Sequence, residues 1–181
     1  MDASDFSPAE LEARLAALHT DSFGWALSCC EWNESDAEDV LQTTYVKVIS
    51  GRARFGGRST FRTWLFGVIR QTAREDRRRA RSHVERAERL AQDPTAGRPV
   101  VLRPDEVQER SERSRTLLRA LDELPGRQRE VLHLVFYQDL TIREAAEVME
   151  VSLGSARVHY ERGKKRLRGL LSLEDVGGGT L

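Results

Sequence analysis

The sequence lacks any apolar run close to the roughly 20 residues that a transmembrane helix requires. Its N-terminus also lacks a basic segment followed by an apolar segment, the pattern of a secretory signal. These two absences predict a cytoplasmic protein that does not insert into a membrane.

Cysteine is nearly absent. The two cysteines, Cys29 and Cys30, are adjacent in the chain and therefore cannot cross-link distant segments. No cluster of histidine or cysteine lies near them, so a structural zinc site is not expected. The pair is interpreted as two small thiols in or near a helical core.

Catalytic motifs are also missing. There is no phosphate-binding Gly-Lys-Ser/Thr loop, no His-Glu-x-x-His and no paired catalytic set, and Gly56-Gly57-Arg58-Ser59 alone is a weak signal. We therefore expect a protein that is not an enzyme and that needs no cofactor or metal.

Net charge is zero, with 29 basic and 29 acidic residues, but the charges are segregated. Up to Gly51 the only basic side chains are Arg14 and Lys47. Arginines then dominate from Arg52 to Arg89, and a second basic run follows between Arg162 and Arg168. Because salt screens fields beyond about 8–10 Å, each basic run can bind phosphates although the total charge is zero.

The hydrophobic periodicity is helical throughout, and no alternation of the kind found in β-strands is evident. The pattern predicts an all-α fold with two small helical domains, the second containing a helix-turn-helix. The first domain spans residues 1–81 and the second 112–171, with a flexible linker at 82–111 and a tail at 172–181. Helices are expected at about 8–32, 36–49, 61–81, 113–124, 127–137, 142–149 and 153–170. The helix at 113–124 is marked by Leu117, Leu118, Leu121 and Leu124 and stops at Pro125-Gly126.

The helix starting after Ser59 or Thr60 has two contrasting faces. Its apolar positions follow the helical period closely: Phe61, Trp64, Leu65, Val68, Ile69 and Thr72. The opposite face is predicted to carry arginines: Arg70, Arg74, Arg77, Arg78 and Arg81. Few acidic residues pair with them, which favours phosphate contact over a merely solvated surface.

The C-terminal domain contains the signature of a helix-turn-helix. Thr141 and Glu144 form a capping box at the start of a short helix, and Ser152 caps a longer basic helix. With Leu153, Ala156 and Tyr160 turned inward, the outward positions suit DNA bases and phosphates. These outward residues are Ser155, Arg157, Val158, Glu161, Arg162, Lys164 and Lys165.

Two sets of residues resemble a known family. Asp36–Gln42 followed by Ser59–Leu65 resembles region 2 of bacterial sigma factors. Leu124–Leu132, with the helix-turn-helix that follows, resembles region 4. Both sets, in this order, are similar to the compact extracytoplasmic-function sigma factors, which consist of two helical domains and a linker.

The resemblance implies partners and roles. Core RNA polymerase would bind the helix 36–49 through Asp36, Asp39, Gln42 and Lys47. The minus-ten promoter element would be opened and held by Phe55, Arg58, Arg70, Gln71, Arg74, Arg77 and Arg78. The outward residues of the last helix would bind the minus-thirty-five element. An anti-sigma protein is a common further partner in the family.

Several positions depart from the family pattern. Gln71 stands where many relatives have Asn, Ile49 where an aromatic is usual, and Glu150 where the turn usually has Gly. Val158 replaces a common polar residue on the reading face. The alternative interpretation is a stand-alone helix-turn-helix regulator, which explains the second half of the chain but not the arginines of the first.

Overall fold

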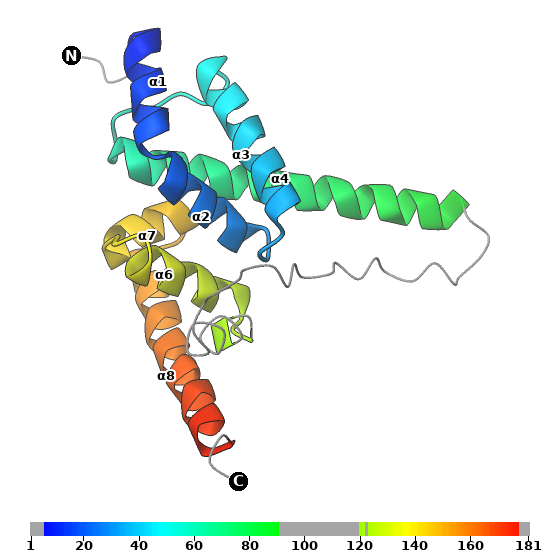
Figure 1. The fold of residues 1–181 in the computed structure, drawn as a ribbon, viewed down its shortest axis with the longest axis vertical. Coiled ribbons are helices and arrows are strands. Elements are labelled where there is room, and N and C mark those ends of the chain that lie inside the picture. The colour runs from blue at the N-terminus through cyan, green and yellow to red at the C-terminus, as the bar shows by residue number, and fades with distance from the viewer. Residues whose placement is uncertain (1–5, 91–119, 122, 178–181) are drawn as a thin grey trace. The chain divides into compact units, whose positions relative to one another are not determined.

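The computed structural model describes residues 6–90, 120–121 and 123–177, and within these ranges the regular structure is helical, without a strand. The chain divides into two compact units, Met1–Pro104 and Asp105–Leu181. The first unit contains α1 (Pro8–Ala17), α2 (His19–Cys29), α3 (Glu34–Ile49) and α4 (Phe61–Leu90). The second contains α6 (Gly126–Phe136), α7 (Ile142–Met149) and α8 (Leu153–Gly177) (Figure 1). The predicted all-α, helix-turn-helix fold is confirmed. Most of the predicted linker, and most of the helix predicted at 113–124, lie outside the described residues.

The N-terminal segment forms two helices, not the single helix predicted for residues 8–32. Ser7 and Glu10 form a capping box at the start of α1. The helix ends at Leu18, whose backbone (φ −99°, ψ 4°) leaves the helical range while its N–H still bonds back into α1. A second break follows α2, where Glu31 and Trp32 both adopt positive φ angles. The second break adjoins the gap at 33–35 that was predicted between the first two helices, whereas the break at Leu18 contains no Gly or Pro that could have indicated it.

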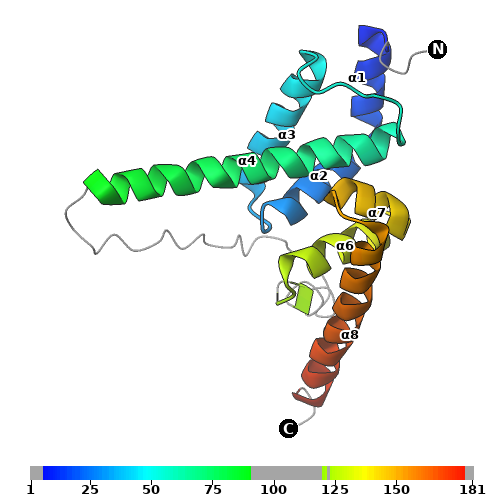
Figure 2. The same ribbon diagram turned by 180° about the vertical axis from the view of Figure 1, so that it is seen from behind.

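The core of the first unit lies where α2 and α3 pack against α4 (Figures 1 and 2). Trp25 of α2 and Phe66 of α4 are fully buried, and the Trp25 indole N–H donates to the backbone carbonyl of Phe66 at 3.0 Å. A buried indole N–H without such a partner would cost stability, so this bond makes the position specific for Trp.

The α4 helix extends well past this core. Its start is capped by Thr60, whose Oγ1 accepts from the N–H of Thr63 at 3.1 Å, which resolves the choice between Ser59 and Thr60. Phe61, Leu65 and Ile69 are buried as predicted, whereas Trp64 and Val68 are only half-buried. The helix continues to Leu90, beyond the predicted end near Arg81, so residues 82–90 of the predicted linker are helical.

The second unit has the predicted caps. Thr141 and Glu144 form the capping box of α7, and Ser152 accepts from the N–H of Ser155 at 3.1 Å at the start of α8. Glu150, in the turn between them, is left-handed with φ 53°. Because a side chain in that region costs about 1–2 kcal/mol, Glu150 strains the turn at a position where the resemblance implies glycine.

The α8 helix packs against both α6 and α7. Ala156 is fully buried at its contact face, as predicted. Gly163, also buried, permits the close approach to α6. The helix ends at Gly177, past the predicted end at Leu170, and so includes part of the predicted tail.

The cysteines are free, with Cys29 buried and Cys30 half-buried. Burial, with a smaller contribution from the nearby Asp36 carboxylate, raises the pKa of Cys30 to about 12. Because the thiolate is the reactive form, Cys30 is a poor nucleophile. Among the described side chains, no group of His, Cys, Asp or Glu is arranged to hold a metal ion. No described helix is both long and apolar enough to cross a bilayer.

Candidate functional site

The exposed arginines of α4 begin one turn later than predicted. Arg74, Arg77, Arg78 and Arg81 are exposed and spaced along one face of the helix. Arg70, predicted on the same face, is only 3% exposed. The exposed position predicted for Arg70 is therefore wrong, because the first half of α4 is covered by both α2 and α3. Arg70 is unavailable to DNA without a rearrangement of this core.

One exposed arginine already has an acidic neighbour. The Arg77 guanidinium lies 3.6 Å from the carboxylate of Glu31, and Glu31 belongs to the strained turn after α2. Both side chains are largely exposed, and ion pairs of that kind contribute little to stability. Arg77 can therefore exchange this neighbour for a phosphate at small cost.

Gln71 lies within a hydrogen-bond network that joins α3 to α4. Its side-chain amide donates to Glu75 Oε1 at 3.2 Å. The Lys47 ammonium donates to the other oxygen of Glu75 at 2.7 Å and to Thr72 Oγ1 at 3.0 Å. Lys47 was predicted to face core polymerase, but the structure turns its ammonium toward α4.

Phe55 belongs to an aromatic cluster. Its ring lies 5.6 Å from Phe61 and 5.5 Å from Trp64, and it stacks on Phe6 at 5.9 Å between centroids. The Arg14 guanidinium lies 4.2 Å from the Phe6 centroid. Phe6 could not be predicted as a member of this cluster, since nothing in the sequence pattern connects a residue before α1 with the loop after α3. Stacking of an unpaired base on Phe55 would have to use the exposed part of this half-buried ring.

The loop that carries Phe55 also carries Arg58, which is exposed. A pocket of about 310 Å³ adjoins the aromatic cluster and is lined by Phe55, Trp64 and Arg54 among others. The loop therefore places aromatic edges and cationic groups near one another, as single-stranded nucleic acid requires.

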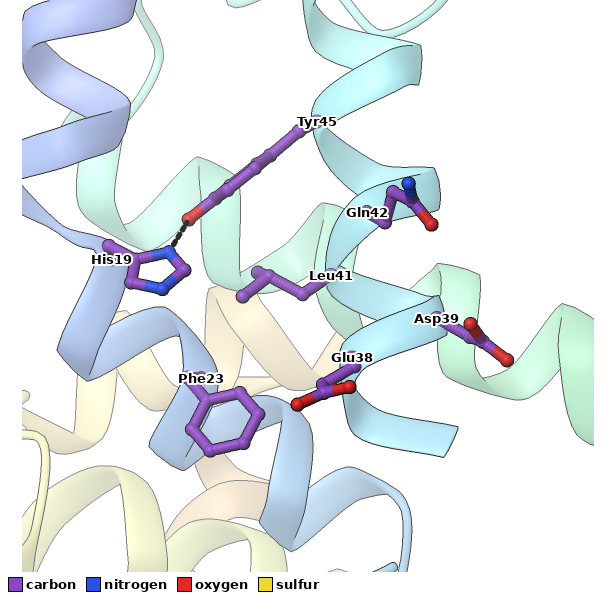
Figure 3. A pocket seen from close by; sticks show the side chains of 7 residues that line it. All are labelled: His19, Phe23, Glu38, Asp39, Leu41, Gln42 and Tyr45. Carbon is purple, nitrogen blue, oxygen red and sulfur yellow. Dashed lines mark hydrogen bonds between the residues drawn. The ribbon is translucent and has the colours of Figure 1, made fainter. Parts of the chain in front are cut away.

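A larger pocket of about 580 Å³ lies between α2 and α3 (Figure 3). His19 Nδ1 and the Tyr45 hydroxyl lie 3.2 Å apart and bridge the two helices. Leu41 points toward α2, whereas Asp39 and Gln42 point away from it (Figure 3). The side of the pocket from α2 is therefore aromatic, whereas α3 contributes both polar side chains and the apolar or aromatic Leu41 and Tyr45. The contribution of α2 could not be read from the sequence.

The acidic residues at the start of α3 affect one another. Asp36 and Asp39 are both exposed. Partial burial, followed by the charges of Asp76 and Asp39, raises the pKa of the Asp36 carboxyl above its ordinary value. Clustered acids of this kind attract a basic partner surface.

The predicted reading face of α8 is exposed. Ser155, Arg157, Val158, Glu161 and Arg162 all face solvent, and Val158 is 47% exposed. The C-terminal end of α7 is held against α6, since Arg127 of α6 donates to the backbone carbonyl of Met149 at 3.0 Å.

Two residues of the predicted set contact each other. The Lys164 ammonium lies 3.1 Å from the Glu161 carboxylate and 4.6 Å from the centroid of Tyr160. Tyr160 in turn stacks on Phe136 of α6 at 5.9 Å. Lys165 is exposed, and within the described part of the chain its side chain forms no ion pair or ring contact. Glu161 and Lys164 therefore have to separate before both can contact DNA.

Comparison with known proteins gives matches to both units. Residues 19–83 match the family model for sigma-70 region 2, and residues 114–167 match the model for sigma-70 region 4. The chain is similar to the ECF RNA polymerase sigma factor SigX of Bacillus subtilis, with 31% identity covering 75% of this chain and 71% of SigX. It is also similar to the RNA polymerase sigma factor CarQ of Myxococcus xanthus, with 30% identity covering 77% and 76%.

Solved structures show the same fold. The sigma factor RpoE of Bartonella quintana, in complex with the anti-sigma factor NepR, superposes with a TM-score of 0.70 at 22% identity, covering 89% of this chain and 96% of RpoE. CnrH, in complex with the cytosolic domain of CnrY, gives a TM-score of 0.62 at 22% identity, covering 94% of this chain and 93% of CnrH.

Proposed function

The chain belongs to the extracytoplasmic-function RNA polymerase sigma factors, and we propose that its two units divide the recognition of a promoter between them. As a sigma factor it directs core RNA polymerase to specific promoters and helps to open DNA for transcription initiation. The observation that carries this conclusion is the pair of matches to regions 2 and 4, in that order along one chain.

We propose that core polymerase binds the outer face of α3. Asp36, Asp39 and Gln42 are exposed, and Asp39 and Gln42 point away from α2 (Figure 3). Because the Lys47 ammonium contacts Glu75 and Thr72, its predicted part in this interface requires those bonds to break first.

We propose that the minus-ten element lies along α4 and the loop before it. Gln71 would contact a base, Arg74, Arg77 and Arg78 would hold phosphates, and Arg58 with the exposed part of Phe55 would flank the strand. Support comes from the exposure of these arginines and from the aromatic groups beside them.

We propose that α8 enters the major groove at the minus-thirty-five element. Arg157 and Arg162 have the donors to pair with guanine, and Val158 can contact a thymine methyl. Lys165 lies further along the exposed face and suits a phosphate, while Glu161 and Lys164 would contact DNA after parting from each other.

The remaining proposals concern partner, place and activity. The superposed RpoE and CnrH structures are complexes, with NepR and with the cytosolic domain of CnrY, and NepR is named an anti-sigma factor. We propose that this chain likewise has an anti-sigma partner. We further propose that it acts in the cytoplasm and, like other sigma factors, is a polymerase subunit without catalytic activity of its own.

Binding to core polymerase tests the proposal. The full-length chain should co-elute with core RNA polymerase in size-exclusion chromatography, and Asp39→Arg should weaken that binding by about tenfold or more. Glu12→Arg is the matched control, because Glu12 is an exposed acid on α1 and the same change of charge there should leave binding unchanged. If the chain binds duplex promoter DNA tightly by itself and ignores core polymerase, the stand-alone regulator is favoured instead.

A further inference from the structure

We propose that Glu75 is a positioning residue that orients the Gln71 amide. As a result, thymine is disfavoured at the base position that Gln71 contacts. The inference rests on the proposed role of Gln71 at the minus-ten element and deepens it. Glu75 itself need not touch DNA.

The geometry begins at Lys47. Its side chain is 21% exposed, and its ammonium reaches from α3 to α4, where it donates to Glu75 Oε2 at 2.7 Å and to Thr72 Oγ1 at 3.0 Å. These two bonds fix the Glu75 carboxylate on the side of α4 that faces α3. The second oxygen, Oε1, accepts from the Gln71 amide nitrogen one helical turn earlier, at 3.2 Å.

The ionisation of Glu75 decides which end of the amide it contacts. The hydrogen bond from Lys47 is the main cause that holds the pKa of the Glu75 carboxyl below its ordinary value. Glu75 is therefore a carboxylate at neutral pH and can only accept hydrogen bonds. An amide carbonyl beside it would be repelled, so the NH₂ group of Gln71 must face Glu75.

The carbonyl oxygen of Gln71 is then the group turned away from Glu75, on an exposed residue. An exposed acceptor pairs best with an exocyclic amino group, which adenine, cytosine and guanine each carry. Thymine has no amino group. Its ring N–H is flanked by two carbonyl oxygens, and both repel an approaching acceptor. The fixed amide thus disfavours thymine at one position.

Without the carboxylate, the amide is free to turn. In Glu75→Gln the new side chain keeps its shape but can present either an oxygen or an NH₂ group to Gln71. Gln71 can then offer NH₂ to the O4 or O2 atom of thymine. Asp76→Asn is the matched control, because it removes an equal charge from the next, exposed residue of α4.

The experiment uses holoenzyme assembled from core RNA polymerase and the full-length chain, transcribing a library with a randomised minus-ten element. Wild type should deplete thymine at one position by about three- to tenfold, the equivalent of one hydrogen bond. Glu75→Gln should abolish that depletion and leave the other positions unchanged, whereas Asp76→Asn should retain it. Lys47→Met, which removes the anchor of Glu75, should reduce the depletion in part.

Other results overturn the inference. If Glu75→Gln and Asp76→Asn give the same sequence preference as wild type, or the same uniform loss of output, Glu75 does not position Gln71. If Gln71→Ala leaves the preference unchanged, Gln71 does not read a base, although the sigma function stands. If wild-type holoenzyme selects no promoter sequence at all, the proposed function itself fails.

Discussion

Gly163 of α8 lies directly against Leu132 of α6. A Cβ atom at position 163 would lie 3.1 Å from Leu132 Cδ1 and 3.2 Å from Gln128 Cβ. Leu132 is 1% exposed, so it has little room to move away from an added methyl group. The helix-turn-helix therefore depends on a glycine in the middle of its longest helix, where the residue type is otherwise unfavourable.

Gly163→Ala should destabilise the second unit by about 1–2 kcal/mol, since overpacking a core outweighs the gain in helix propensity. Gly169→Ala is the control on the same helix, because nothing lies within 4 Å of its added Cβ. That variant should be more stable than wild type by up to about 1 kcal/mol. Hydrogen exchange of the α6 and α8 amides measures the change in stability of both variants. Equal protection in the two variants would show that the α6–α8 contact is loose.

Acid should destabilise the second unit through His133. This side chain is buried, and burial lowers its pKa from 6.5 to about 4. The unfolded chain therefore binds the proton first as the pH falls. The stabilising effect of the neutral ring is complete above about pH 6.5 and declines steadily toward pH 4, by up to about 3 kcal/mol.

Urea unfolding at several pH values measures this effect. All three tryptophans lie in the first unit, so their fluorescence reports the unfolding of that unit alone. Circular dichroism reports both units, and any change in it that occurs without a change in fluorescence reports the unfolding of the second unit. His133→Leu should flatten the decline between pH 6.5 and 4. The burial argument would be refuted by parallel curves for wild type and His133→Leu.

Two exposed residues of α8 should differ in their effects on the minus-thirty-five element. Arg162→Ala should cost about 1–3 kcal/mol at the preferred base pair and relax the preference there. Lys165→Ala should weaken binding to all sequences alike. It should also reduce the slope of log binding constant against log salt concentration by about one. Holoenzyme binding to a randomised upstream element at several salt concentrations separates the two effects. The same uniform loss in both variants would contradict the placement of α8 in the groove.

Much of the second unit could be predicted from the sequence because its signals are local. The capping box at Thr141, the cap at Ser152 and the buried Ala156 all follow from residues a few positions apart. Periodicity also identified α3 and the buried face of the first half of α4.

The remaining features depend on contacts between distant segments. Arg70 was expected to be exposed, because periodicity assigns one buried face to a helix and cannot reveal that two neighbours cover it. The close approach at Gly163 likewise depends on a residue of another helix. The bond from Lys47 to Glu75 crosses between helices and was likewise unpredictable. These are the positions where packing, rather than pattern, decides the structure.

The most direct test of promoter recognition by the two units is transcription in vitro from a fully randomised promoter library, with core RNA polymerase in the presence and absence of the full-length chain. The chain should enrich transcripts preceded by two short sequence elements near minus ten and minus thirty-five. Arg162→Ala should alter only the upstream element, and Gln71→Ala only the downstream one. Transcripts with no enriched sequence, or output no higher than that of core polymerase alone, would contradict the assignment.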